Sequence, residues 1–361
     1  MAERILQVVT DTDRRGAQVF ATDLHEALVT RGQSVETVAL APGTVGGLDL
    51  PVLGPSRRHP RTMAALRRAS RRATVVVAHG STTLPMCALV RPATRTPFVY
   101  RQISESTFWA GSTARRLRVR AALMLASGVV ALWSGSATTL ETAFGVPRRK
   151  IRVVPNGVPP ERFPPVDRAV TAAARAALGL DPARPTVLSI GALVPEKGVD
   201  VAVRAIGTVE PVQLLVVGEG PERSRLEVLA DQVAPGRVTF TGSVRESRPC
   251  FEAADMVVLP SRGGDSMPAV LIEAGLMGVP AIATPVEGIV EILDEGRAGE
   301  IVAKDDDVAL ARAISGLLDD VPRARQLAEA ARAHCLTRYA IGVVAERWLR
   351  VLDEAERRSQ L

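Results

Sequence analysis

The sequence predicts an α/β protein built from two doubly wound domains, each with a parallel sheet covered by helices on both faces. Short apolar, β-branched runs alternate with helical patterns along the 361 residues, which is typical of strand–helix–strand units. The chain is 47% hydrophobic but only 3% aromatic. Its core must therefore be built mainly from Ala, Val, Leu and Ile, as in sheets buried on both faces.

The first half is expected to hold six strands. The longest apolar run, 121–133, is too short to span a membrane and is interrupted by Ser127 and Gly128, so we interpret it as a helix end followed by a strand. The six strands are expected at residues 4–9, 34–40, 73–80, 97–101, 128–133 and 151–156.

A proline-rich connector is expected at residues 156–168, where four prolines crowd a segment with no apolar period. Prolines at this density favour an extended linker. We therefore expect a first domain at 1–160, a second at 161–340, and a C-terminal helix at 341–361. The stretch 337–358 is amphipathic and is expected to be helical. The second domain is expected to hold strands at 186–193, 212–220, 237–242, 256–261, 280–286 and 299–304.

Two such domains joined by one linker are expected to face each other across a cleft. Ligands of open α/β sheets bind beyond the carboxyl ends of the strands. The loops that follow strands are therefore the places where a site is expected.

The charge is unevenly distributed along the chain. Residues 1–165 carry 23 Lys and Arg against 10 Asp and Glu, whereas the remainder carries 22 against 29. Basic clusters lie at 56–73 and 114–122. Two interpretations stay open, a surface for an anionic partner or anionic membrane and a solvated Arg-rich helix face. Nucleic acid is disfavoured, because few aromatic side chains could stack on bases.

Several other classes of site find no support in the sequence. Cys87, Cys250 and Cys335 are far apart, which disfavours a disulfide framework or a cysteine zinc site and favours a reducing cytosol. The opening MAERILQVVT passes directly into a strand, so no signal peptide is expected. The sequence has no Ser-His-Asp spacing, His/Cys metal cluster or Walker loop, and no Asp-x-Asp pair is expected to hold a divalent metal for a diphosphate.

The most informative stretch is PSRGGDSMPAVLIEAGLMGVPAIAT, residues 260–284. A helix is expected from Pro268 to Leu276, with Asp265 or Ser266 as its cap. Its first N–H groups lack partners and carry the positive end of the helix dipole, so they suit a phosphate.

Two carboxylates flank this expected phosphate site. Asp265 would reach past the phosphate to neutral hydroxyls, and Glu273, in an almost wholly apolar stretch, would accept from a second hydroxyl pair. A phosphate between two hydroxyl-rich groups describes a nucleotide-sugar. The alternative is that Asp265 merely caps the helix and Glu273 faces solvent.

Two further strand-end loops belong to the second half. In SIGALVPEKGVD, 189–200, Gly191 closes a strand and Lys197 begins a helix. Lys197 is one of three lysines in an Arg-rich chain, which suggests a compact positive charge for phosphate. Gly218 and Gly220 follow the next strand, but Arg223 stands where a dinucleotide-binding fingerprint needs a third glycine.

In the first half, Gly16 lies at a strand–helix turn within TDTDRRGAQVF, and His79 ends a strand in VVVAHGSTT. A lone histidine is more often structural than functional, although a strand end is where a ligand would bind. The polar loop 100–106 also follows a strand and is left unassigned.

Together these loops resemble the retaining glycosyltransferases of family 4, which have the GT-B fold. The resemblance covers essentially the whole chain and rests on VVPNGV (153–158), GALVPEKGVD (191–200), VVGEGPE (216–222), VTFTGSV (238–244) and the stretch 260–284. It implies two Rossmann-like domains and a C-terminal helix that crosses back to the first.

The resemblance also implies roles for individual residues. Asp265 would contact the donor sugar and Glu273 the ribose hydroxyls, in a signature of two acidic residues separated by seven others. Lys197 would stabilise the diphosphate leaving group, and His79 would lie near the sugar. Gly16 and Gly191 would lie beside the donor, Val244 would meet the base through its backbone, and Ser266, Met267, Pro268 and Ala269 would hold the distal phosphate.

We therefore expect a metal-independent bacterial enzyme, with no cofactor, that moves a sugar from a nucleoside-diphosphate sugar to a glycan, lipid-linked or small-molecule acceptor with retention of configuration. We expect it in the cytoplasm, in peripheral contact with an anionic membrane. Two departures from the family pattern are Asp265, where Glu is usual, and Ala192, where many members carry Arg. A GT-B epimerase or hydrolase and a non-catalytic nucleotide-sugar-binding protein stay open as alternatives.

Overall fold

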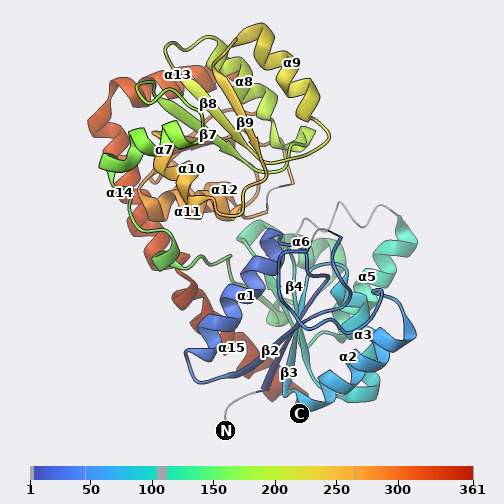
Figure 1. Ribbon diagram of the computed structural model, residues 1–361. Coiled ribbons are helices and arrows are strands. Elements are labelled where there is room, and N and C mark those ends of the chain that lie inside the picture. Colours follow the sequence, from blue (N-terminus) through green and yellow to red (C-terminus); the bar gives the residue numbers. More distant parts are fainter. Residues whose placement is uncertain (1–3, 45, 104–111, 265, 361) are drawn as a thin grey trace. The chain divides into compact units, whose positions relative to one another are not determined.

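The chain folds into two compact units, each a parallel sheet between layers of helices (Figure 1). A computed structural model describes residues 4–44, 46–103, 112–264 and 266–360. Unit 1 comprises residues 1–158 and 339–361, and unit 2 comprises residues 159–338. The sequence had placed these divisions at 160 and 340.

Unit 1 contains a six-stranded parallel sheet in the order β2-β1-β3-β4-β5-β6. The order reverses between β1 and β3, which makes their carboxyl ends the switch point of this sheet. Its strands are β1 (Arg4–Val9), β2 (Ser34–Ala39), β3 (Val75–His79), β4 (Phe98–Arg101), β5 (Gly128–Ala131) and β6 (Ile151–Val153), and its helices are α1 (Gly16–Val29), α2 (Pro60–Arg72), α3 (Thr83–Thr94), α5 (Thr113–Leu125), α6 (Ser134–Phe144) and α15 (Ile341–Gln360).

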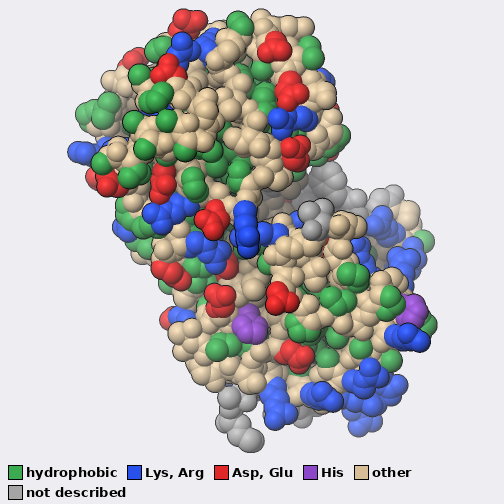
Figure 2. Space-filling model, viewed as in Figure 1, with side chains coloured by type: hydrophobic (Ala, Val, Ile, Leu, Met, Phe, Trp, Pro, Cys, Tyr) green, Lys and Arg blue, Asp and Glu red, His purple; other side chains and the backbone are tan. Residues whose placement is uncertain are grey.

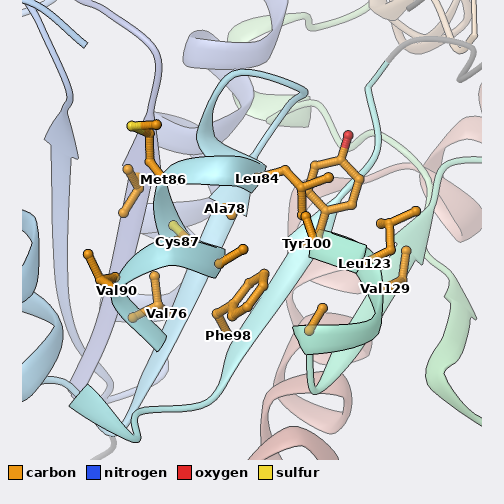
Figure 3. Close-up of a cluster of buried hydrophobic side chains, with 14 of the residues drawn as sticks. Val76, Ala78, Leu84, Met86, Cys87, Val90, Phe98, Tyr100, Leu123 and Val129 are labelled. Atoms are coloured by element: carbon orange, nitrogen blue, oxygen red, sulfur yellow. The ribbon is translucent and has the colours of Figure 1, made fainter. Parts of the chain in front are cut away.

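Alternate residues of these strands bury two separate apolar faces, because successive side chains of a strand point to opposite sides of the sheet. On one face, Val76, Phe98 and Tyr100 pack against α3 and α5, as Figure 3 shows. On the other face, Val75 and Val77 pack against α1 and α15. The C-terminal helix α15 is therefore part of the core of unit 1.

Unit 2 repeats this design with the strand order β12-β11-β10-β7-β8-β9. Here the order reverses between β7 and β10. The strands are β7 (Thr186–Ile190), β8 (Gln213–Val217), β9 (Val238–Gly242), β10 (Met256–Leu259), β11 (Ala281–Ala283) and β12 (Glu300–Ile301), and the helices are α7 (Thr171–Ala177), α8 (Val199–Gly207), α9 (Arg223–Val233), α10 (Arg248–Ala253), α11 (Ala269–Met277), α12 (Ile289–Ile292), α13 (Asp307–Asp319) and α14 (Val321–Arg338).

Three local expectations need correction. The helix expected over 337–358 is divided, because α14 ends at Arg338 and α15 begins at Ile341, with Ala340 in a β-bridge to Val158. The connector is not wholly extended, since one 3₁₀ turn interrupts it (Pro160–Arg162) and another begins at its last residue (Arg168–Val170). The last strand is much shorter than the expected 299–304. In the described parts of the chain, no helix is both long and apolar enough to cross a bilayer.

Candidate functional site

The loops after β7 and β8 pack closely at the carboxyl edge of the sheet in unit 2. A Cβ added to Gly218 would lie 1.8 Å from the carbonyl oxygen of Gly191, and one added to Gly220 would lie 2.2 Å from that of Leu193. The N–H of Leu193 also donates to the carbonyl of Glu219 at 2.9 Å. Glycines are needed at these positions because the backbones of the two loops are in contact and leave no room for a Cβ atom. The segment that carries Lys197 therefore lies beside the β8 loop.

Lys197 ends a 3₁₀ turn (Pro195–Lys197) that leads into α8. The next residue, Gly198, has φ of +63° and stands at the N-cap of α8, and a Cβ there would lie 2.1 Å from the carbonyl oxygen of Pro260. The Lys197 side chain is half-buried. The turn therefore fixes Lys197 between the ends of β7 and β10, the two strands at which the sheet order reverses.

The segment after Lys197 is tied to the β10 loop by Arg262. Its Nη1 and Nη2 atoms donate to Oδ1 and Oδ2 of Asp200 at 2.8 and 3.0 Å, and Nη1 also donates to the carbonyl of Pro195 at 2.7 Å. Nε donates to Asp305 at 2.5 Å. The pKa of Asp200, which burial alone would raise, is held below its ordinary value by the hydrogen bonds and charge of Arg262 together with Arg204.

The loop after β10 leads into α11. Ser266 and Met267 are buried, and Pro268 occupies the N-cap position without a side-chain hydrogen bond to the helix. The helix has no acidic residue in its first turn, so its first N–H groups and dipole are available to an anion. Asp265, expected as cap and sugar contact, lies outside the described residues, and Ser266 does not cap the helix.

Glu273 lies one turn into α11 and is half-buried, neither enclosed nor freely exposed. The hydroxyl of Ser247 donates to its Oε2 at 3.1 Å. Ser247 ends the loop that follows β9, and Val244, half-buried, belongs to the same loop. The carboxylate of Glu273 thus faces the segment that the sequence assigned to the base.

The two site residues expected in the first half lie at the switch point of the sheet in unit 1. Gly16 begins α1 after the β1 loop, is exposed, and has nothing within 4 Å of an added Cβ. His79 is the last residue of β3, as the sequence predicted for a strand end.

His79 is buried, with 2% of its surface exposed. Its Nε2 lies 2.9 Å from Oε1 of Gln7, and its ring is flanked by Phe20 and Trp348, each with a centroid separation of 6.2 Å. Burial, reinforced by the charge of Arg101, lowers the pKa of His79 well below its ordinary value, so the ring is neutral at pH 7. Its contact with a sugar stays a prediction.

Arg101 supplies a buried positive charge next to His79. Its guanidinium lies 3.8 Å from the centroid of the Phe20 ring and donates through Nη2 to Oδ1 of Asn156. Burial lowers the pKa of Arg101 to about 9, so the group remains charged at neutral pH. Nothing in the sequence singled out Arg101, which lay in the unassigned loop 100–106 and which the structure places at the end of β4.

Chemically, the edge of the sheet in unit 2 is suited to an anion with polar groups on either side. Lys197 and the N-terminus of α11 supply positive charge, and Glu273 supplies an acceptor for hydroxyls. Within the described residues, no group of three His, Cys, Asp or Glu side chains is arranged to hold a metal ion.

The sequence interpretation identified Lys197 and Glu273 but missed the residues that hold them. Asp200 lay within a motif quoted for its resemblance, and Arg262 lay within the most informative stretch. Ser247 carried no signal beyond its place between the strands expected at 237–242 and 256–261.

Two family models match the chain. Residues 14–162 match the model described as "Glycosyltransferase Family 4", and residues 184–320 match "Glycosyl transferases group 1". Together they cover most of both units.

Relatives of known function are similar over part of their length. The D-inositol 3-phosphate glycosyltransferase of Nocardia farcinica is 35% identical over 58% of this chain and 49% of its own length. The lipopolysaccharide core biosynthesis glycosyltransferase LpsE of Rhizobium meliloti is 30% identical over 57% and 58%. The chain thus matches about half the length of these relatives.

Solved structures share the fold across almost the whole chain. Anabaena Alr3699/HepE, solved in complex with UDP-glucose, has a TM-score of 0.84 and 20% identity. The match covers 97% of this chain and 99% of HepE. WaaG, involved in lipopolysaccharide biosynthesis, has a TM-score of 0.74 and 17% identity over 96% of this chain and 99% of its own.

Proposed function

Since the chain belongs to the family-4 glycosyltransferases and has the GT-B fold, we propose that it transfers a sugar from a nucleoside-diphosphate sugar to an acceptor hydroxyl. The observation that carries this proposal is that Lys197, the uncapped N-terminus of α11 and Glu273 all belong to segments that follow β7 and β10 at the same edge of the sheet. These groups match the diphosphate and the ribose of a nucleotide-sugar. UDP-glucose is bound by the structural neighbour HepE, which supports this class of donor.

The proposed chemistry is electrostatic. When the glycosidic bond breaks, negative charge grows on the departing diphosphate, and Lys197 and the α11 N–H groups would stabilise it there. Because these fixed positive groups belong to the chain, we propose a reaction that needs no metal ion. We propose further that the acceptor attacks from the face that the diphosphate leaves, so that the anomeric configuration is retained.

The acceptor is proposed to be a glycan, a glycolipid or a natural product under assembly. Relatives named for D-inositol 3-phosphate and for the lipopolysaccharide core support this range. We place the acceptor on unit 1, since the groups that suit the donor lie on unit 2.

The basic face of unit 1, formed by arginines of α2 and α5, is proposed to contact an anionic membrane. Between residues 50 and 140 the sequence contains 14 arginines and one acidic residue. Figure 2 shows Lys and Arg side chains gathered over the region of these helices. Exposed Leu117 and Met124 on α5 add apolar contacts that a lipid surface can accept. The arginines are Arg61, Arg67, Arg68, Arg71 and Arg72 on α2, and Arg115, Arg116, Arg118 and Arg120 on α5.

The test is a turnover assay with UDP-, GDP-, ADP- and dTDP-sugars and a panel of acceptor glycans and lipids. We expect acceptor-dependent release of the nucleoside diphosphate from one donor class, unchanged by a chelator, with a product whose anomeric configuration matches the donor by NMR. Lys197→Ala should lower kcat about 100-fold or more.

Other outcomes would contradict parts of the proposal. Donor cleavage at the full rate without acceptor would favour an epimerase or hydrolase. Tight donor binding with no turnover across the panel would favour a binding protein. An inverted product, or loss of activity with the chelator that added metal restores, would refute the proposed chemistry.

A further inference from the structure

A second cluster of charged side chains follows β1 in unit 1, directly before Gly16, and none of these side chains was assigned to the donor. Asp11 lies at its centre, with 1% of its surface exposed. Arg15 donates from Nη2 to both carboxylate oxygens of Asp11, at 2.6 and 2.5 Å. Arg57, on the segment before α2, donates to Oδ2 at 3.3 Å. The buried amide of Gln18 donates to Oδ1 at 2.8 Å and completes the cluster.

These hydrogen bonds hold the two guanidinium groups in place but use only some of their N–H donors. Each uses only its Nη2 atom toward Asp11, and the side chains of Arg15 and Arg57 remain 57% and 50% exposed. An arginine has five N–H donors in a planar fork, so each group keeps donors beyond those that it uses on Asp11. Two guanidinium groups that meet at one carboxylate can together bind a second anion from outside the protein, if that anion has several oxygen atoms.

The loop that carries Asp11 is preorganised by the segment 43–48. The hydroxyl of Thr12 accepts from the N–H of Gly43 at 2.9 Å, and Oδ1 of Asp13 accepts from that of Gly46 at 2.9 Å. Asp13 also lies 3.7 Å from Arg15. Arg15 and Arg57, together with their sequence neighbours Arg14 and Arg58, outnumber Asp11 and Asp13, so the region around the cluster is positively charged.

The position of the cluster points to a substrate. β1 borders the switch point of the sheet in unit 1, and ligands of such sheets bind at this edge. We propose that Arg15 and Arg57 bind an anionic group of the acceptor, a phosphate or a carboxylate, with Asp11 fixing their separation. The inference rests on the proposed function and narrows the acceptor to an anionic class.

The probe is inorganic phosphate, titrated calorimetrically at constant ionic strength onto the full chain. The protein is first saturated with the nucleoside diphosphate that binds best, so that the donor phosphate site is filled. Chloride serves as the monovalent comparison. Arg15→Gln and Arg57→Gln each remove one guanidinium group from the cluster. Arg58→Gln is the matched control, because it removes the same charge from a neighbouring exposed residue outside the cluster.

We expect saturable phosphate binding that weakens about tenfold in Arg15→Gln and in Arg57→Gln and less than about twofold in Arg58→Gln. Arg57→Lys, which keeps the charge but loses the fork, should give an intermediate loss. Should Arg15→Gln unfold, the Arg57 variants carry the test, since Arg57 is the more distant partner of Asp11.

Two results would overturn the inference alone, with nucleotide binding intact. One is phosphate binding no tighter than chloride. The other is an equal loss in Arg57→Gln and Arg58→Gln, which would indicate general charge rather than a site. Failure of every nucleoside diphosphate to bind the wild-type chain would instead overturn the proposed function and this inference with it.

Discussion

Arg262 and Asp200 form a two-point ion pair that joins the loop after β10 to the first turn of α8, with distances of 2.8 and 3.0 Å between the paired atoms. The side chain of Asp200 is 6% exposed and that of Arg262 is 29% exposed. Arg262 also holds the carbonyl of Pro195, two residues before Lys197. The pair therefore positions the lysine that the proposed chemistry needs.

Loss of this pair should destabilise the chain and loosen the segment that carries Lys197. Asp200→Asn should lower the free energy of unfolding by roughly 2–4 kcal/mol, because it leaves Arg262 and Arg204 without the carboxylate. Urea unfolding measures the change. The matched control is Arg297→Gln, which removes the exposed Arg297–Asp294 pair and should leave the free energy of unfolding nearly unchanged. Equal costs would contradict the positioning role.

The same pair predicts a pH dependence of stability in acid. The pKa of Asp200 lies below its ordinary value of 3.8, so its contribution is complete well above pH 3.8 and is lost as the pH falls through the lower, folded-state pKa. The difference in unfolding free energy between wild type and Asp200→Asn should be constant from neutral pH down to about pH 5 and shrink below about pH 4. A difference that grows in acid would refute the assignment.

His79 should remain neutral in the pH range in which an ordinary histidine takes up a proton. Because burial, with the nearby charge of Arg101, lowers its pKa well below 6.5, its ring NMR signals should not shift between pH 8 and about pH 6. The unfolded state binds the proton more readily, so this group's contribution to stability falls as the pH drops below about 6.5. His79→Gln should remove that slope. Titration near pH 6.5 would contradict the buried placement.

The contact between the β7 and β8 loops should tolerate no side chain on the glycine that makes it. Gly218→Ala places a Cβ 1.8 Å from the carbonyl oxygen of Gly191, at a φ of +136°. We expect a loss of roughly 2–4 kcal/mol in unfolding free energy. Gly316→Ala, within α13 and with nothing within 4 Å of the new Cβ, should instead stabilise by about 0.5–1 kcal/mol. Chemical unfolding of both variants checks the contrast.

The two sheets could be predicted because short, continuous apolar runs such as VQLLVV are typical of strands that are buried on both faces of a parallel sheet. It could not predict the break between α14 and α15. There the N–H of Val158 donates to the carbonyl of Tyr339, and that of Ile341 donates to the carbonyl of Val158. These bonds come from the distant connector, whereas the local pattern is helical throughout.

In the candidate site, too, local sequence patterns predicted some residues, whereas contacts between distant segments could not be predicted. Lys197 and Glu273 were identifiable because each is chemically unusual where it stands, a rare lysine at a turn and an acid in an apolar helix. Their partners were not, since the Arg262–Asp200 pair and the Ser247–Glu273 hydrogen bond join segments far apart in the sequence. The cluster around Asp11 was missed for the same reason, because Arg57 reaches it only in the folded sheet.

The carboxyl edge of the sheet in unit 2 is proposed to bind a nucleotide-sugar, and calorimetric titration of UDP, GDP, ADP and dTDP sugars decides whether it does. The wild-type chain should bind one donor class, and Glu273→Ala and Lys197→Ala should each weaken that binding about tenfold or more while the fold is retained. Binding of a donor with equal affinity in wild type and both variants, or binding of none by the folded wild-type chain, would contradict the claim.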